Sequence, residues 1–212
     1  MQQFFTKPSQ IRDGRIVLGE PDVNHIKNVL RMKPGAEVRI SDGTGNAYLC
    51  CIRSYGEREA VLDILKELSA DTELPSKIWL FQGLPKGDKM DLIVQKAVEL
   101  GVYGIVPFAA KRSVVKLDER KAKKKQERWQ AIAKSAAEQS GRSRIPEVEQ
   151  VVSFSGALRT AGGLDVLLIP YELEEGMGKT AQIIEDITPG QSIGVFIGPE
   201  GGFEEAEVGQ AK

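Results

Sequence analysis

The sequence predicts an α/β protein with a small N-terminal β domain and a larger C-terminal domain built on a mostly parallel sheet. Two patterns support this fold class. Short β segments separated by turn signals fill the first 70 residues, and apolar strands then alternate with helices. The 212 residues suffice for one small and one larger domain, and the 41% hydrophobic and 28% charged residues are typical of a soluble globular protein.

The N-terminal segments predict a small β-barrel over residues 1–70. We expect strands at residues 15–18, 37–40, 47–53 and 60–65, with glycine-containing turns at residues 33–35 and 42–45. Residues 22–31 have apolar side chains at helical spacing and predict one short helix. Residues 69–76 are polar, contain Pro75 and form the expected linker.

The second domain is expected over residues 75–212. It is predicted to have strands at residues 78–82, 104–108, 164–169 and 192–197, and helices at residues 89–100, 118–139 and from residue 205. Asp88 is expected to cap the first helix, with Asp91 in the capping-box position and Gly101 at the end. Trp129 and Phe154 lie in helical patterns and are expected in the core.

The net charge of −1 hides a strong asymmetry along the chain. Residues 77–145 contain 16 Lys and Arg against 7 Asp and Glu, a net +9, whereas residues 146–212 contain 3 against 12, a net −9. The basic stretch predicts a surface that faces a polyanion, although a solvated basic helix over residues 121–125 would give part of the same pattern. Basic residues at loop or element ends are the better RNA candidates, because they can converge on phosphates. They are Lys86, Lys89, Arg112, Lys116, Arg142 and Arg144.

Several classes of function are not expected. The N-terminus lacks a secretory signal and no run reaches the roughly 20 apolar residues of a membrane span, so we expect a cytoplasmic protein. Cys50 and Cys51 are adjacent and would point to opposite faces of a strand, which argues against a disulfide. With His25 as the single histidine, no metal site is expected, and His25 is interpreted as structural or RNA-facing.

Two glycine-containing segments follow predicted strands. Residues 197–202 (IGPEGG) lie after strand 192–197, where parallel sheets bind ligands, and their glycines would let the backbone approach a cofactor. An ordinary strand-to-helix turn has the same spacing, so both interpretations stay open. Residues 176–180 (GMGKT) suggest a phosphate-binding loop, but Leu173 stands where that motif needs glycine, and nucleotide triphosphate hydrolysis is not expected.

Five segments in order resemble the bacterial 16S ribosomal RNA uracil-N3 methyltransferases. They are residues 25–31 (HIKNVLR), 83–91 (GLPKGDKMD) with 95–102 (QKAVELGV), 111–116 (KRSVVK), 136–142 (AAEQSGR) with 145–146 (IP), and 197–202 (IGPEGG). The resemblance implies a PUA-like N-terminal barrel, a trefoil-knotted SPOUT methyltransferase domain, a homodimer, S-adenosylmethionine as cofactor, and the 16S RNA of the small ribosomal subunit as partner. Since family members continue beyond the position of Lys212 into the segment that threads the knot, we expect a longer natural chain.

The resemblance also implies site residues. The expected cofactor contacts are Leu168, Ile169, Pro170, Ile197, Gly198, Pro199, Glu200, Gly201 and Gly202. The expected RNA contacts are Arg31, Lys86, Lys89, Arg112 and Arg142. Glu204 stands where relatives often have a serine or threonine cap, and a glutamate is expected to cap poorly.

The methyl group of a sulfonium is already activated, so the protein must align the uridine N3 with it and help to remove the N3 proton. Glu200 is the candidate base or uracil-positioning group, and Arg112 is the candidate for stabilising the uracil anion. Two alternatives stay open: an RNA-binding ribosome assembly factor without catalysis, and a SPOUT methyltransferase that acts on transfer RNA or on another ribosomal nucleotide.

Overall fold

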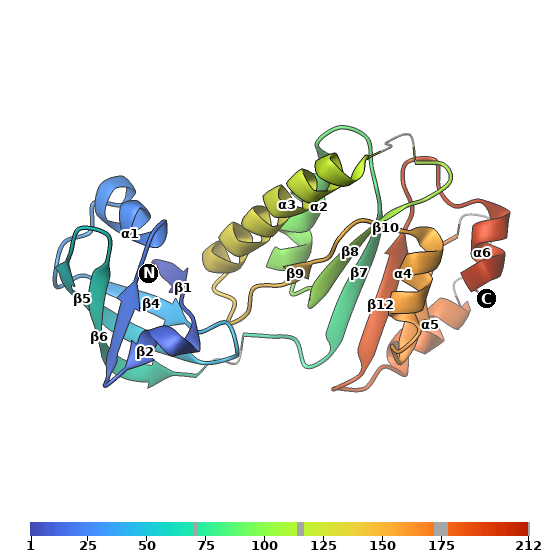
Figure 1. Cartoon of the computed structure of the whole chain (residues 1–212). Coiled ribbons are helices and arrows are strands. Elements are labelled where there is room, and N and C mark those ends of the chain that lie inside the picture. The colour runs from blue at the N-terminus through green and yellow to red at the C-terminus, as the bar shows by residue number, and fades with distance from the viewer. Residues whose placement is uncertain (70–71, 114–116, 172–177, 212) are drawn as a thin grey trace. The chain divides into compact units, whose positions relative to one another are not determined.

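The computed structural model describes residues 1–69, 72–113, 117–171 and 178–211, and the chain forms two compact units (Figure 1). The first unit comprises Met1–Glu73 and Ala137–Ile145, and the second comprises Leu74–Ala136 and Pro146–Lys212. Residues 137–145 thus belong with the N-terminal unit, although they are far from it in the sequence.

The first unit is built on one six-stranded sheet with the order β1-β4-β5-β6-β3-β2. Its strands are β1 (Gln3–Phe5), β2 (Ile11–Arg12), β3 (Arg15–Leu18), β4 (Glu37–Ser41), β5 (Ala47–Tyr55) and β6 (Ala60–Leu68). β1 pairs with β4 in parallel, and the other neighbours are antiparallel. The four predicted strands are confirmed. β1 and β2 were not predicted, because two or three residues are too short to show an alternating pattern.

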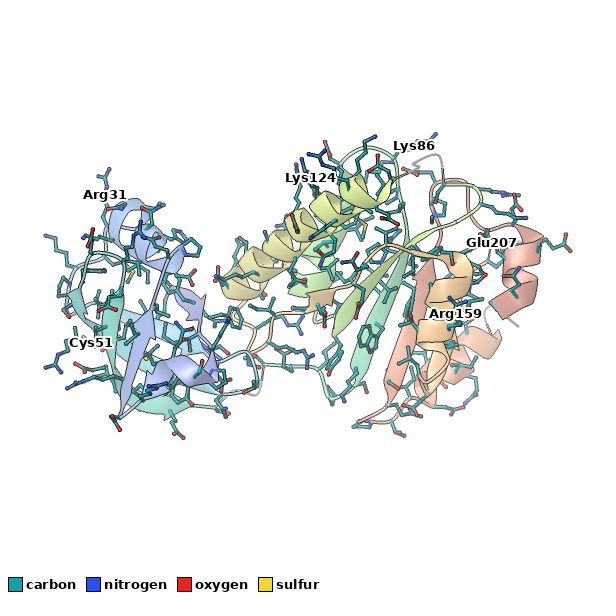
Figure 2. All side chains as sticks on the ribbon, in the orientation of Figure 1. Arg31, Cys51, Lys86, Lys124, Arg159 and Glu207 are labelled. Atoms are coloured by element: carbon teal, nitrogen blue, oxygen red, sulfur yellow. The ribbon has the colours of Figure 1, made fainter. Side chains whose placement is uncertain are left out.

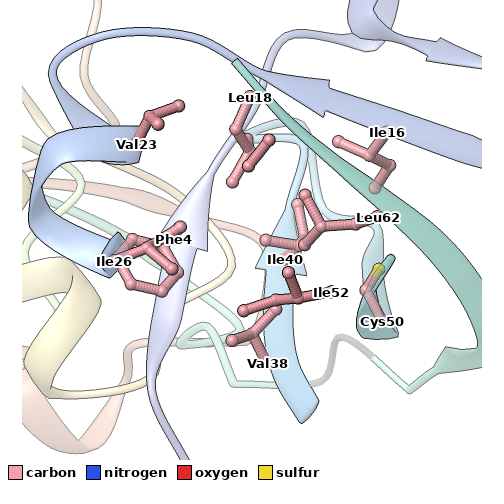
Figure 3. Packing of buried hydrophobic residues seen from close by; sticks show 11 residues of the cluster. Phe4, Ile16, Leu18, Val23, Ile26, Val38, Ile40, Cys50, Ile52 and Leu62 are labelled. Carbon is pink, nitrogen blue, oxygen red and sulfur yellow. The ribbon is translucent and has the colours of Figure 1, made fainter. Parts of the chain in front are cut away.

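The core of this unit is formed by alternate residues of the strands (Figure 3). In β3, Ile16 and Leu18 are buried, whereas the intervening side chains are exposed. The predicted helix over residues 22–31 is present as a short α1 (Asp22–Asn24) that continues in a π-helical turn, η2 (His25–Val29). Val23 and Ile26 of this segment reach the core.

The second unit contains a parallel sheet with the order β10-β8-β7-β12-β11, and β9 pairs with β8. Its strands are β7 (Lys77–Gly83), β8 (Gly104–Ala109), β9 (Glu147–Val148), β10 (Val152–Ser153), β11 (Val166–Leu168) and β12 (Ser192–Ile197). The predicted parallel sheet is confirmed. β7 and β12 are neighbours although more than 100 residues separate them. From β7 the chain continues to β8 on one side of this pair, whereas it reaches β12 from β11 on the other side. Such a reversal is where α/β sheets bind ligands.

Helices cover both faces of this sheet. Figure 1 shows α2 (Lys89–Glu99) and α3 (Glu119–Gln139) on one side and α4 (Phe154–Ala161) on the other, while α5 (Gly178–Glu185) and α6 (Glu205–Ala211) follow later in the chain. The face under α4 has a core of phenylalanine rings, in which Phe81 and Phe196 stack with centroids 4.4 Å apart. The predicted core positions of Trp129 and Phe154 are confirmed, with 2% and 5% of their surfaces exposed.

The ends of α2 only partly agree with the sequence prediction. Gly101, with φ of 98°, follows the end of the helix as expected. The predicted side-chain cap is wrong, because Asp88 makes no capping hydrogen bond and its carboxylate lies 3.6 Å from Lys125 Nζ instead. Asp91 likewise pairs with Arg128 of α3. Basic side chains of the neighbouring helix therefore compete for the two carboxylates.

Candidate functional site

Two loops meet at the carboxyl ends of β7 and β12. A Cβ atom added to Gly83, the last residue of β7, would lie 2.7 Å from Cδ and 2.8 Å from N of Pro199. The backbone N–H of Lys86 donates to both carboxylate oxygens of Glu200, at 3.2 and 3.3 Å, and Lys89 Nζ donates to Oε1 at 2.6 Å. The glycine-rich loop after β12 is therefore held against the loop after β7, and only glycine at position 83 permits this approach.

These contacts change the acidity of Glu200. The hydrogen bond from Lys89 is the main cause that lowers the pKa of Glu200 from 4.5 to about 2, with help from backbone N–H groups. The carboxylate therefore stays charged at neutral pH and is a weak proton acceptor there. The low pKa argues against the predicted role of Glu200 as a base, and its contacts with Lys86 and Lys89 hold the glycine-rich loop.

Arg112 reaches the same loop from the segment that follows β8. Its Nη1 donates to the carbonyl oxygen of Gly201 at 2.9 Å. A Cβ atom added to Gly201 would lie 3.3 Å from Cβ of Arg112, so the two backbones approach closely. Arg112 is exposed and has five N–H donors, of which this contact uses one, so the guanidinium is suited to stabilising an anion beside the loop.

A small hollow of about 150 Å³ lies beyond the carboxyl ends of β11 and β12. It is lined by Pro170, Tyr171, Gly198, Pro199, Gly202 and Phe203. Four of these six residues were predicted cofactor contacts, whereas no sequence pattern indicated Tyr171 or Phe203. The rings offer flat apolar surfaces and the glycine backbones offer polar groups, a combination that fits part of a nucleoside cofactor.

The structure also locates the other predicted cofactor residues. Leu168 ends β11, Ile169 follows it and packs partly against the phenylalanine core, and Ile197 ends β12 with 38% of its surface exposed. A Cβ atom added to Gly198 would meet the backbone of Gly202 at 3.2 Å, so the loop folds tightly on itself. The predicted segments of β11 and β12 therefore converge on one edge of the sheet.

The predicted RNA residues fall in both units. The second unit contains Lys86, Lys89 and Arg112, which lie on loops or at a helix start at the carboxyl edge of its sheet. Figure 2 labels Lys86 at this edge. Arg31 lies in the first unit, exposed after η2 with φ of 53°. Lys116 lies outside the described residues, as do Gly176 and Met177 of the GMGKT segment.

Arg142 does not fit the predicted RNA contact. Only 3% of its surface is exposed, and its guanidinium forms an ion pair with Glu73 inside the first unit. Gln3 Nε2 also donates to the Arg142 carbonyl oxygen at 2.6 Å. Because a phosphate cannot reach a buried and paired guanidinium, Arg142 is left out of the proposed RNA surface. It holds residues 137–145 on the N-terminal unit instead.

The described residues form neither a membrane-spanning helix nor a cluster of metal ligands. In the parts of the chain that the structure describes, no helix is both long and apolar enough to cross a membrane. The same parts contain no group of three or more histidine, cysteine, aspartate or glutamate side chains that could hold a metal ion.

Comparison with known families decides the classification. Residues 72–212 match the model described as an RNA methyltransferase domain, and residues 18–65 match the model described as an RNA methyltransferase PUA domain. The chain belongs to this RNA methyltransferase family. The resemblance in the sequence is thereby confirmed, together with the expected fold class of an α/β domain and a PUA-like domain.

Individual relatives of this RNA methyltransferase carry more specific names. The Ribosomal RNA small subunit methyltransferase E of Bacillus subtilis is 39% identical over 98% of this chain and 84% of its own length. The protein of that name from Mycobacterium tuberculosis is 30% identical over 87% and 70%.

Two solved structures with bound S-adenosylmethionine have the same fold. The Neisseria gonorrhoeae ribosomal RNA small subunit methyltransferase E has a TM-score of 0.83 and 33% identity, over all of this chain and 85% of its own. A putative methyltransferase from Legionella pneumophila has a TM-score of 0.85 and 29% identity, over 99% and 84%.

Proposed function

We propose that this RNA methyltransferase transfers the methyl group of S-adenosylmethionine to N3 of one uridine in the decoding region of 16S ribosomal RNA. The proposal depends on the loop Gly198–Gly202, which is held against the end of β7, next to the reversal point of the sheet, and borders a hollow beyond the carboxyl ends of β11 and β12. The names of the relatives support a substrate in the small ribosomal subunit.

The cofactor site is formed by the chain segments after β11 and β12. Leu168, Ile169, Pro170 and Ile197 lead into the hollow, and the backbone of the glycine-rich loop borders it. We assign the adenosyl part of the cofactor to this edge, since relatives of similar fold were solved with S-adenosylmethionine bound. When bound, the sulfonium supplies an electrophilic methyl group that needs no further activation.

The side chains around the loop have separate roles in catalysis, in holding the loop and in RNA binding. Arg112, exposed beside Gly201, stabilises the negative charge that the uracil gains when N3 loses its proton. Glu200 accepts hydrogen bonds from the Lys86 backbone and from Lys89, and so fixes the loop. The ammonium groups of Lys86 and Lys89, together with Arg31 of the PUA-like domain, bind RNA phosphates and give the complex a strong dependence on salt.

The wider biological setting is also part of this proposal. We infer a cytoplasmic homodimer with a trefoil-knotted methyltransferase domain, and the support is the resemblance of the five sequence segments to the bacterial family. Chemical cross-linking and sedimentation of the purified protein test the dimer.

The direct test is a modification map. Purified protein and S-adenosylmethionine are incubated with 16S RNA and with small subunits that lack the modification, and nuclease fragments are analysed by mass spectrometry. We expect one added methyl group on N3 of one uridine. RNA binding without methyl transfer would instead support a ribosome assembly factor, and a methyl group on transfer RNA or on another ribosomal nucleotide would support a SPOUT enzyme of different specificity.

A further test separates a role of Glu200 in holding the loop from its predicted role as a base. The Glu200→Gln variant should lower the affinity for S-adenosylmethionine, because the amide no longer attracts Lys89 as an anion. The pH dependence of kcat should stay unchanged, since a group with a pKa of about 2 does not titrate near neutral pH. If the variant instead lost the acidic limb of the pH profile, which is the fall in kcat at low pH, Glu200 would be identified as the base and a role limited to holding the loop would be contradicted.

A further inference from the structure

A buried carboxylate joins the glycine-rich loop to the Arg112 segment. Glu207, labelled in Figure 2, lies in the first turn of α6 with only 3% of its surface exposed. Its Oε2 accepts a hydrogen bond from the backbone N–H of Glu204 at 2.9 Å, and its Oε1 accepts one from the backbone N–H of Lys111, also at 2.9 Å. The two oxygens therefore bind two different segments of the chain.

The helix end alone does not explain this arrangement. A glutamate three residues into a helix commonly bonds the N–H that precedes the helix, and the contact with Glu204 fulfils that role. The second oxygen turns instead to the segment after β8, more than 90 residues away in the sequence. Burial of a carboxylate is costly unless hydrogen bonds compensate it, so both N–H groups are needed to keep Glu207 inside.

The hydrogen bond between Glu207 and the Lys111 backbone also restrains Arg112. Arg112 is the next residue along the chain, and its Nη1 bonds the Gly201 carbonyl oxygen at 2.9 Å. Gly201 and Glu204 belong to the same loop. Glu207 joins this loop to the backbone of Lys111, and Arg112 joins the same loop to the next residue of that segment. Lys111 Nζ adds an exposed ion pair with Glu204 at 3.3 Å, which screening by water makes weak.

We propose that Glu207 is a positioning residue that fixes the distance between the Arg112 segment and the glycine-rich loop. The proposal rests on the proposed function, in which Arg112 stabilises the uracil anion beside the cofactor. Glu207 itself is buried and does not line the hollow. Its contribution is therefore made through Arg112 and affects kcat, while the affinity for S-adenosylmethionine depends mainly on the loop and the hollow.

The first experiment compares Glu207→Gln with Glu205→Gln. Both changes remove one negative charge from the first turn of α6, but Glu205 is exposed and makes neither backbone contact. A glutamine has one acceptor and one donor group, so Glu207→Gln must lose one of the two bonds. We expect kcat to fall on the order of 10- to 100-fold, as for a small misplacement of a reacting group. The Glu205→Gln enzyme should keep wild-type kcat.

A double-mutant cycle tests the route through Arg112. In an Arg112→Ala background, Glu207→Gln should change kcat by less than about twofold, because the residue being positioned is absent. An equal fold-change with and without Arg112 would overturn the proposal, because it would show that Glu207 acts on catalysis independently. If Glu207→Gln does not fold, Glu207→Asp serves in its place, since it keeps the charge but shortens the reach to Lys111.

Hydrogen exchange provides a readout that does not depend on activity. The backbone N–H groups of Lys111 and Glu204 should exchange slowly in the wild-type protein and in Glu205→Gln, and at least one should exchange faster in Glu207→Gln. Unchanged exchange at both amides would reject the role of Glu207. If the wild-type protein transfers no methyl group while the exchange result is as expected, the proposed function fails and the positioning of the two segments by Glu207 stands.

Discussion

The close approach of Gly83 to Pro199 gives the sharpest prediction about the cofactor loop. In Gly83→Ala, the new Cβ atom would lie 2.7 Å from Cδ and 2.8 Å from N of Pro199, and 3.1 Å from the Gly198 carbonyl carbon. The second and third of these atoms belong to the backbone, so no rotation of a side chain relieves the overlap. The loop after β12 must move away from β7.

The size of the effect follows from the cost of overpacking. Forcing an extra methyl group into a filled site costs about 1–3 kcal/mol. If the loop must return to its original position to bind S-adenosylmethionine, this cost appears in the binding free energy. At about 1.4 kcal/mol for each factor of ten, the affinity should fall by about 5- to 150-fold.

Isothermal titration calorimetry with S-adenosylmethionine measures this loss. Gly163→Ala is the matched control, because it makes the same chemical change where no atom lies within 4 Å of the added Cβ. We expect wild-type affinity for the control. If Gly83→Ala binds the cofactor within twofold of the wild-type affinity, the loop position described here is not the binding position.

Three further predictions concern charge, stability and thiol reactivity. In Lys89→Ala, the pKa of Glu200 should rise from about 2 toward 4.5, as measured by carboxyl NMR titration. In the wild-type protein this pKa is lowered, so the contact with Lys89 is lost only as the pH falls through about 2. An unchanged titration midpoint of Glu200 in the variant would contradict the pairing. Phe196→Ala, which removes a ring stacked on Phe81, should lower the free energy of unfolding by about 3–5 kcal/mol in urea denaturation, and a loss below about 1 kcal/mol would contradict the packing. Burial raises the pKa of Cys50 to about 12, so iodoacetamide should modify the half-buried Cys51 but not Cys50 in the native protein, as mass spectrometry would show.

The sequence predicts best those elements whose pattern is local and repeated. Strand β12 and the glycine-rich loop after it are recognisable because an apolar run ends at a cluster of glycines. β9 and β10 contain two residues each, which is too short for any periodic signal. Residues 137–145 join the first unit through contacts with residues far away in the sequence, and no local pattern reveals such contacts.

In the candidate site, likewise, the sequence predicts the local motifs but not the contacts between distant residues. The sequence and its resemblance name Gly198–Gly202 and Arg112, and the structure brings them together. They do not reveal that Lys89 lowers the pKa of Glu200, that Glu73 pairs with the buried Arg142, or that Glu207 binds the Lys111 N–H. Each of these depends on which charged group folds next to which, and composition alone cannot supply that information.

The central claim is that the loop after β12 and the end of β11 hold S-adenosylmethionine. Backbone NMR of the isotopically labelled protein, titrated with this cofactor alone, tests the claim most directly. We expect the largest shifts at the amide signals of Tyr171, Gly198, Gly202 and Phe203, because these residues line the hollow. Shifts confined to the PUA-like domain, or no shifts at saturating cofactor, would contradict it.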